Sequence, residues 1–157
     1  MRLDIKNIIC ASLILTYPLQ SFGEESLEGK FERSYSKWKK DRITHYLIKT
    51  NYSAFTPLSG LWEIEFGNGK VLSARLNSEK NTNPNIAFRF TMDGLYQMVE
   101  KIYAKGKSAK KTILVEYDKK NGYIKRVSGI VEEFSMNPPK KDIGFSIEVI
   151  EFRSYKK

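Results

Sequence analysis

The sequence has only one cysteine and one histidine in 157 residues. Cys10 lies in an N-terminal apolar stretch that we expect to be removed, which leaves no disulfide, no thiol nucleophile and no cysteine ligand for a metal. His45 is therefore alone, so a two-histidine zinc motif is impossible within one chain. No Gly-x-Ser-x-Gly elbow accompanies it for Ser-His-Asp catalysis. We expect no metal site, no cofactor and no histidine-based catalysis.

Carboxylates suited to paired acid-base work are also few. Glu132 and Glu133 are adjacent and would point to opposite faces of a strand, so they do not form a pair. Asp118 is expected to accept hydrogen bonds within its own turn. No glycine-rich phosphate loop precedes a helix. Asp93 is among the remaining acids. A hydrolase with a carboxylate-based site is therefore possible, but it ranks third, behind the two binding functions given at the end of this section.

The N-terminus has the pattern of a secretory signal peptide. Arg2 and Lys6 precede an apolar run over residues 8–19, and the small residues Ser21 and Gly23 suit cleavage before residue 24. The run is shorter than the roughly 20 residues that span a bilayer. We expect residues 1–23 to be cleaved, with an uncleaved anchor as the alternative. The protein would then be exported, periplasmic or secreted, and would meet the membrane only transiently through the signal peptide.

The remaining segment, residues 24–157, has the size of a single domain. An apolar content of 41% with 29% charged residues is typical of a globular protein, so a core can form without disulfides.

Cleavage would lower the formal net charge from +9 to +8. Such a charge attracts polyanions and anionic surfaces, although solubility alone can also account for it. No single run is dense enough for a nucleic-acid arm, so no nucleic acid is expected.

Two amphipathic segments and about six alternating segments predict an α+β fold. Helices are expected over residues 24–42 and 91–106. Strands are expected over residues 44–55, 61–66, 70–76, 113–117, 123–134 and 144–155. The connections within each strand group are short or moderate, so the sheet should be mostly antiparallel, with both helices on one face and the order αβββαβββ. The polar stretch 77–85 is expected to be a loop.

Several residues have specific structural roles in this prediction. Thr91 is expected to cap the second helix and Gly106 to end it. A β-bulge at Gly129 would account for a slip in the alternation of the fifth strand. The same patterns place Leu72 on one face with Ala74 and Leu76, and they place Glu63 or Glu65 outward, opposite Lys49 or Arg75. The last strand changes parity near Ile150, which indicates either burial on both faces or a kink.

A series of motif positions follows a recognisable order along the chain: Trp38, Tyr46, Gly69-Lys70-Val71, Thr91, Asp93, Leu95, Tyr117, Asp118, Gly122 and Tyr123. This order resembles an uncharacterised family of small exported or lipid-anchored bacterial proteins, known as a domain of unknown function. The resemblance covers most of residues 24–157, and it implies export and a shared fold but no known reaction.

Two departures from that family pattern limit what the resemblance implies. Ile124 stands where the family usually has proline, and the stretch 52–55 lacks a cysteine pair that many members have. Any role of those cysteines is absent here.

Two functions from different classes are left open. The first is a non-enzymatic binding or interaction module of the cell envelope, expected to be monomeric, with an unknown envelope protein as partner; exposed aromatics around Tyr46, Tyr52, Trp62 and Tyr123 would support it. The second is a protein that binds a polyanion or an anionic membrane surface through basic residues. The candidate contacts are Lys107, Lys110, Lys111, Lys119, Lys120, Lys125 and Arg126.

Overall fold

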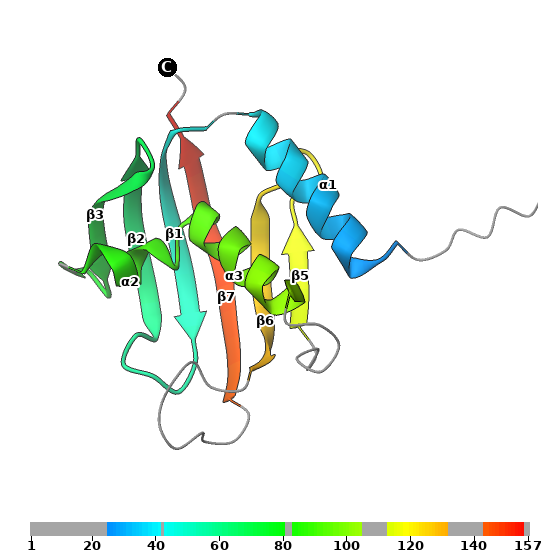
Figure 1. Ribbon diagram of the computed structural model, residues 1–157. Helices are drawn as coiled ribbons and strands as arrows, with labels where there is room; N and C mark the ends of the chain where they lie inside the picture. Colours follow the sequence, from blue (N-terminus) through cyan, green and yellow to red (C-terminus); the bar gives the residue numbers. More distant parts are fainter. Residues whose placement is uncertain (1–24, 42, 81–82, 105–112, 132–142, 156–157) are drawn as a thin grey trace, which may run out of the picture.

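A computed structural model describes residues 25–41, 43–80, 83–104, 113–131 and 143–155. The described chain forms one antiparallel sheet with helices on one of its faces (Figure 1). The helices are α1 (Leu27–Lys40), α2 (Pro84–Phe88) and α3 (Met92–Ala104). The strands are β1 (His45–Ser53), β2 (Gly60–Gly67), β3 (Lys70–Leu76), β4 (Glu79–Lys80), β5 (Ile113–Tyr117), β6 (Ile124–Val131) and β7 (Ile143–Ser154).

The expected α+β class and antiparallel pairing are confirmed, but the strand count and the element order differ. The sheet has seven strands in the order β4-β3-β2-β1-β7-β6-β5. Along the chain, β4 and α2 occupy part of the stretch that we expected to be a loop. Both elements are too short for hydrophobic periodicity to reveal them, since α2 has five residues and the described part of β4 is two exposed charged residues. The last strand in sequence, β7, lies in the middle of the sheet between β1 and β6.

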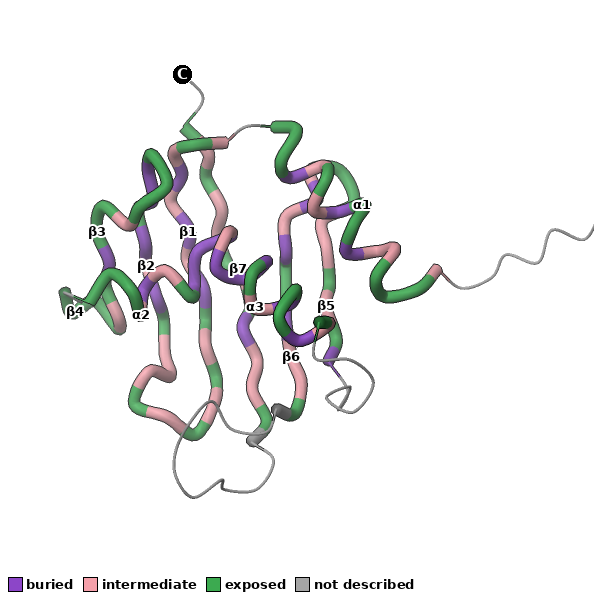
Figure 2. Tube along the Cα trace, viewed as in Figure 1, coloured by how far each residue is buried: buried purple, intermediate pink, exposed green. Residues whose placement is uncertain are grey.

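The core lies between the helices and one face of the sheet. Figure 2 shows the buried positions following this layer along the central strands. Tyr46 and Ile48 of β1 and Trp62 and Ile64 of β2 are fully buried, as the period-two alternation predicts. The indole of Trp62 stacks on Phe90 at a centroid distance of 4.6 Å. Because Tyr46 and Trp62 belong to the core, they are not exposed aromatics that could form a binding surface.

Register shifts at three β-bulges in the described sheet, in β3, β6 and β7, change which side chains of these strands face the solvent. The predicted bulge at Gly129 is wrong, because the irregularity lies where Lys125 has no partner on β5. In β7, Ile150 is skipped opposite β1, so the strand is kinked and this side chain is exposed. Leu72 is skipped in the same way opposite β2 and points outward, contrary to expectation. A bulge reverses the facing of every later residue, and simple alternation cannot locate it.

The helix starts follow the local chemistry. Ser26 caps α1 and accepts a hydrogen bond from the backbone N–H of Gly29 at 3.0 Å. The Thr91 hydroxyl accepts from the N–H of Gly94 at 3.1 Å, which confirms the predicted cap of α3. The predicted helix end at Gly106 lies outside the described residues.

Candidate functional site

The predicted basic site is only partly described. Lys107, Lys110 and Lys111 lie outside the described residues. Lys119 and Lys120 are exposed in the turn between β5 and β6. Lys125 and Arg126 are exposed at the start of β6. The described members therefore belong to one hairpin at one end of the sheet.

The turn that holds the two lysines is built by Asp118. Its carboxylate oxygen Oδ1 accepts hydrogen bonds from the backbone N–H groups of Lys120, at 3.1 Å, and Asn121, at 2.7 Å. Gly122 closes the turn with a left-handed φ of +76° and donates its N–H to the Asp118 carbonyl oxygen at 3.0 Å. The predicted role of Asp118 as a turn residue is confirmed.

Helix α1 holds this turn in place. The Lys37 ammonium donates to the carbonyl oxygen of Lys119 at 2.8 Å, across 82 positions of the chain. A Cβ atom added at Gly122 would lie 2.3 Å from the Ser34 carbonyl oxygen, so the turn touches the helix backbone. The Tyr96 hydroxyl, from α3, donates to the carbonyl oxygen of Gly122. Lys37 is a basic neighbour that the sequence did not assign to this site, because only the tertiary contact brings it there.

Arg126 is in a different electrostatic environment from the turn lysines. It lies between Glu116 on β5 and Glu148 on β7 in the strand register. The two carboxylates reduce the positive potential at this position. The predicted basic set is therefore divided between a turn in which lysines outnumber the one carboxylate, Asp118, and a charge-balanced strand position.

The uncovered face of the sheet carries a row of alternating charges. The Lys49 ammonium lies 3.0 Å from the Glu63 carboxylate and 3.3 Å from the Glu151 carboxylate. The Arg75 guanidinium lies 3.9 Å from Glu63, and Arg153 pairs with Glu151. Hydrogen bonds to the carboxylates of Glu63 and Glu151 raise the pKa of Lys49. The expected pairing of Glu63 with Lys49 and Arg75 is confirmed.

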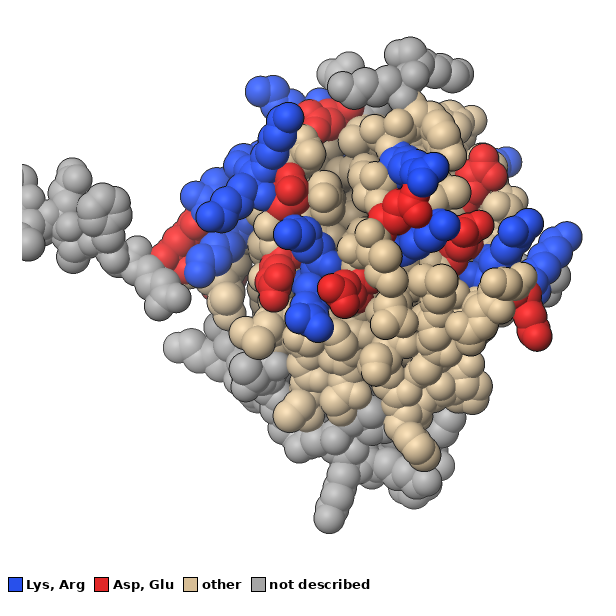
Figure 3. All heavy atoms as spheres, turned by 180° about the vertical axis from the view of Figure 1, so that it is seen from behind, with Lys and Arg blue, Asp and Glu red and all other residues tan. Residues whose placement is uncertain are grey.

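Figure 3 shows where these charges gather on the uncovered face. Lys and Arg side chains are interleaved with Asp and Glu over its upper half, and uncharged residues fill much of the area below. The strand register places Ser53, Ser146, Ser128 and Leu114 in one row across β1, β7, β6 and β5. No described helix covers this face.

A polar cluster joins α1, β1 and the start of α3. The Tyr46 hydroxyl accepts the backbone N–H of Met92 at 3.2 Å and donates to an Asp93 carboxylate oxygen at 3.4 Å. The Lys39 ammonium lies 3.5 Å from the other oxygen of Asp93. Burial raises the pKa of Tyr46, and the charge of Asp93 raises it further. Burial lowers the pKa of Lys39, but Asp93 and Tyr35 outweigh it and the net shift is upward. Tyr46 stays protonated at neutral pH, which suits a structural hydrogen bond better than proton transfer.

Tyrosines also gather between α1, α3 and β5. The rings of Tyr35 and Tyr96 lie 4.9 Å apart, and those of Tyr96 and Tyr117 lie 6.4 Å apart. Burial raises the pKa values of Tyr96, Tyr103 and Tyr117. These hydroxyls are therefore neutral at physiological pH, and the cluster packs as part of the core.

His45 has no carboxylate among its hydrogen-bonding neighbours in the described chain. Its Nδ1 lies 3.2 Å from the Thr44 hydroxyl, and its ring packs over Gly67.

Among the described residues, no three His, Cys, Asp or Glu side chains are grouped to hold a metal ion. None of the described helices is long and apolar enough to cross a membrane.

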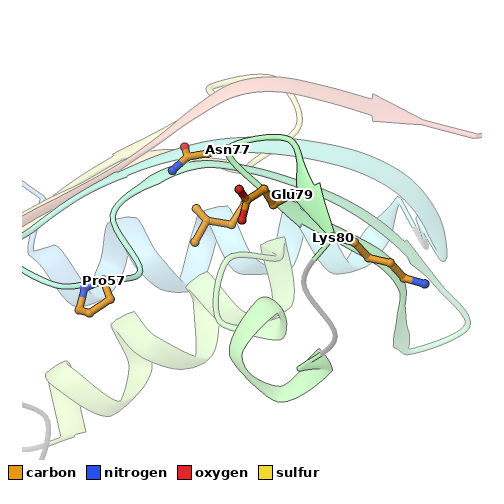
Figure 4. Close-up of a pocket in the computed structure, with 5 residues that line it drawn as sticks. Pro57, Asn77, Glu79 and Lys80 are labelled. Carbon is orange, nitrogen blue, oxygen red and sulfur yellow. The ribbon is translucent and has the colours of Figure 1, made fainter.

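A shallow depression of about 300 Å³ lies beside the turn between β3 and β4 (Figure 4). Its lining residues are Pro57, Leu76, Asn77, Glu79 and Lys80. The Asn77 side-chain oxygen accepts the N–H of Leu61 at 2.9 Å, so the fold uses that group. Glu79 and Lys80 are neighbours on a strand and point apart, and Figure 4 shows the Lys80 amine directed away from the other sticks. The depression does not bring catalytic groups together.

One of three comparisons with known proteins found a match. Comparisons with curated proteins and with solved structures found no match. A family model matches residues 30–131, from the first turns of α1 to the end of β6. That segment is more than half of the chain, and it contains the Thr91 cap, the Asp93 cluster and the Asp118–Gly122 turn. The chain belongs to a family of unknown function (DUF6174).

Proposed function

We propose that the protein is a non-enzymatic binding module that acts in the cell envelope after export. The observation that carries this proposal is the broad uncovered face of the sheet, with its ordered charges and its row of serines. A flat exposed surface suits a macromolecular partner, whereas small ligands are usually enclosed in a concave pocket. The family motifs within the described residues have structural roles as caps and turns, which also favours binding over catalysis.

Site-specific photocrosslinking in the source cells tests the binding face. A photoreactive amino acid at Asn51, which is exposed at the centre of the uncovered face, is expected to give a discrete crosslinked product. The matched control is the same amino acid at Glu32, which is exposed on α1, and it should give no product. Equal products at both positions, or none at Asn51, would contradict the proposal.

Export is tested separately by the N-terminus of the protein recovered from the envelope fraction. Cleavage after Gly23 should leave Glu24 as the first residue in a mass spectrum of the intact protein. Recovery of a full-length chain in the cytoplasmic fraction would contradict export. Recovery of a full-length chain in the membrane fraction would indicate the anchor instead of the cleaved form.

A second candidate function is binding of a polyanion. The contact that favours it is the Lys37–Lys119 hydrogen bond, which holds the basic end of α1 against the basic turn. Retention on heparin at low salt should fall as salt is added, because screening weakens exposed charges. Lys119→Gln with Lys120→Gln should lower the eluting salt concentration more than Lys70→Gln with Lys80→Gln, which removes the same charge elsewhere. Equal shifts for the two double variants would assign retention to net charge alone.

A further inference from the structure

The two edges of the sheet are protected to different degrees. One edge is β4, whose two described residues, Glu79 and Lys80, are both charged and exposed. Short, charged edge strands resist pairing with other chains. The other edge is β5, whose described part, Ile113–Tyr117, has five residues and a single charge, Glu116. Only one of the two edges thus has the features that prevent strand addition.

Strand β5 is a free edge within the described part of the chain. Its backbone pairs with β6, and no other backbone hydrogen bond joins it to a described residue. Leu114 is 61% exposed on the uncovered face. On the helix side, Val115 and Tyr117 are only half-buried. An added strand would satisfy the free backbone groups and cover apolar area on both faces.

The charges at one end of β5 specify what such a strand must carry. Lys119, Lys120 and Lys125 are exposed beside the C-terminal end of this strand. The nearby carboxylate of Asp118 already accepts two backbone hydrogen bonds in its turn. The three lysines outnumber this carboxylate, so acidic side chains on an incoming segment would meet a net positive charge there.

We propose that β5 accepts an extended segment of a partner protein as an eighth strand, and this inference rests on the binding function proposed above. Every strand pair in the sheet is antiparallel, so the segment is antiparallel as well. Its N-terminal end then lies beside the C-terminal end of β5. The segment therefore has acidic residues at its N-terminus, followed by alternating apolar residues. A second copy of this basic chain fits less well, because both copies have the same sign of charge.

Two synthetic peptides of the same composition test the proposal. The first, Asp-Glu-Val-Thr-Val-Thr-Val, has its acids at the N-terminus; the second, Val-Thr-Val-Thr-Val-Glu-Asp, has them at the C-terminus. The first should slow amide hydrogen exchange in β5 and bind about fivefold more tightly, the size expected from two exposed ion pairs. Added salt should remove that preference.

Two matched variants locate the contact. Leu114→Lys places a charge on the edge strand and should abolish the protection of the β5 amides. Ile130→Lys places the same charge on the same face of β6, where Ile130 is 45% exposed, and should leave peptide binding unchanged. Unchanged circular dichroism shows that both variants are folded.

Several outcomes would overturn the proposal. The first is that saturating peptide does not slow amide hydrogen exchange in β5. The second is that the two peptides bind with equal affinity at low salt. The third is that Leu114→Lys and Ile130→Lys have equal effects on peptide binding. Concentration-dependent dimerisation that protects β5 without peptide would assign the edge to a second copy. A crosslink at Asn51 combined with any of these results would leave the proposed binding function intact and remove only the inference about β5.

Discussion

Gly69 and Gly122 have the same left-handed φ of +76° but different surroundings. A Cβ atom at Gly69 would meet nothing within 4 Å, whereas one at Gly122 would lie 2.3 Å from the Ser34 carbonyl oxygen. Gly69→Ala should lower the free energy of unfolding by about 1–2 kcal/mol through backbone strain alone. Gly122→Ala should lower it by about 2–4 kcal/mol, because the helix must also move. Urea denaturation of both variants checks this order, and equal losses would show that α1 moves away freely.

Two fully buried threonines differ in the state of their hydroxyl groups. The Thr50 hydroxyl has no hydrogen-bond partner in the described structure, whereas the Thr91 hydroxyl also donates to the Phe88 carbonyl oxygen at 2.7 Å. Thr50→Val should raise the free energy of unfolding by about 1 kcal/mol, because it removes an unsatisfied polar group. Thr91→Val should lower it by about 1–2 kcal/mol, because α3 loses its cap. Thermal unfolding distinguishes the two, and destabilisation by Thr50→Val would indicate a buried water on that hydroxyl.

Residue roles were predictable from the sequence where the partner is close along the chain. Thr91 and Asp118 bond to groups three or fewer positions away, so local chemistry was sufficient to assign them. The contacts of Gly122 with Ser34, and of Lys37 with Lys119, join distant segments. No local pattern distinguishes a turn glycine that touches a helix from one that faces solvent.

At the scale of elements, Tyr46 couples the central strand to the start of α3. Its hydroxyl satisfies one of the backbone N–H groups that a helix start leaves unpaired. Tyr46→Phe should lower the free energy of unfolding by about 1–3 kcal/mol, because the buried Met92 N–H loses its acceptor. It should also speed hydrogen exchange in the first turn of α3.

Tyr52→Phe is the matched control, since Tyr52 is half-buried on the same strand. Its ring contact with Phe90, at a centroid distance of 5.1 Å, does not involve the hydroxyl. Tyr52→Phe should therefore leave amide hydrogen exchange in α3 unchanged. Faster exchange in both variants would mean that the aromatic packing holds α3 in place, and not the Tyr46 hydroxyl.

The long periodic elements were predictable, and the short ones were not. Both long helices and six strands lie where the sequence patterns placed them, to within a few residues. β4 and α2 together contain seven residues and only one buried side chain, Ala87. Elements of this size are held by tertiary contacts, such as Phe88 on Phe66, that the local sequence does not encode.

The whole molecule should lose stability in alkaline solution. The folded state holds protons on Tyr46, Tyr96 and Tyr117, because burial raises their pKa values. Tyrosines of the unfolded chain ionise near pH 10. Above that pH the unfolded state binds fewer protons than the folded state, so stability falls as pH rises; below it, the contribution is fully present. The raised pKa values of Lys39 and Lys49 act in the same direction.

Urea denaturation between about pH 8 and pH 11 measures this dependence across the range where free tyrosine ionises. The slope above pH 10 should be shallower in Tyr117→Phe than in the parent protein, because one buried ionisable group is gone. A free energy of unfolding that stays constant through this range would contradict burial of the three tyrosines.

For the whole molecule, hydrophobic periodicity predicted the class of fold but not the layout of its surface. The sequence grouped Arg126 with the turn lysines, and only the strand register places it between two glutamates. The sequence also did not predict that β5 is an edge strand. The strands at the edges of a sheet are determined by long-range pairing.

The central position of β7 determines when the parts of the sheet can assemble during synthesis. During synthesis, β1–β3 and the β5–β6 hairpin emerge first, but the strand that joins them is the last of the seven. The two parts cannot share one hydrogen-bonded sheet until β7 is available to pair with both β1 and β6. A chain that stops before β7 therefore has two separate groups of strands, with unpaired edges at β1 and at β6 that could bind other polypeptides.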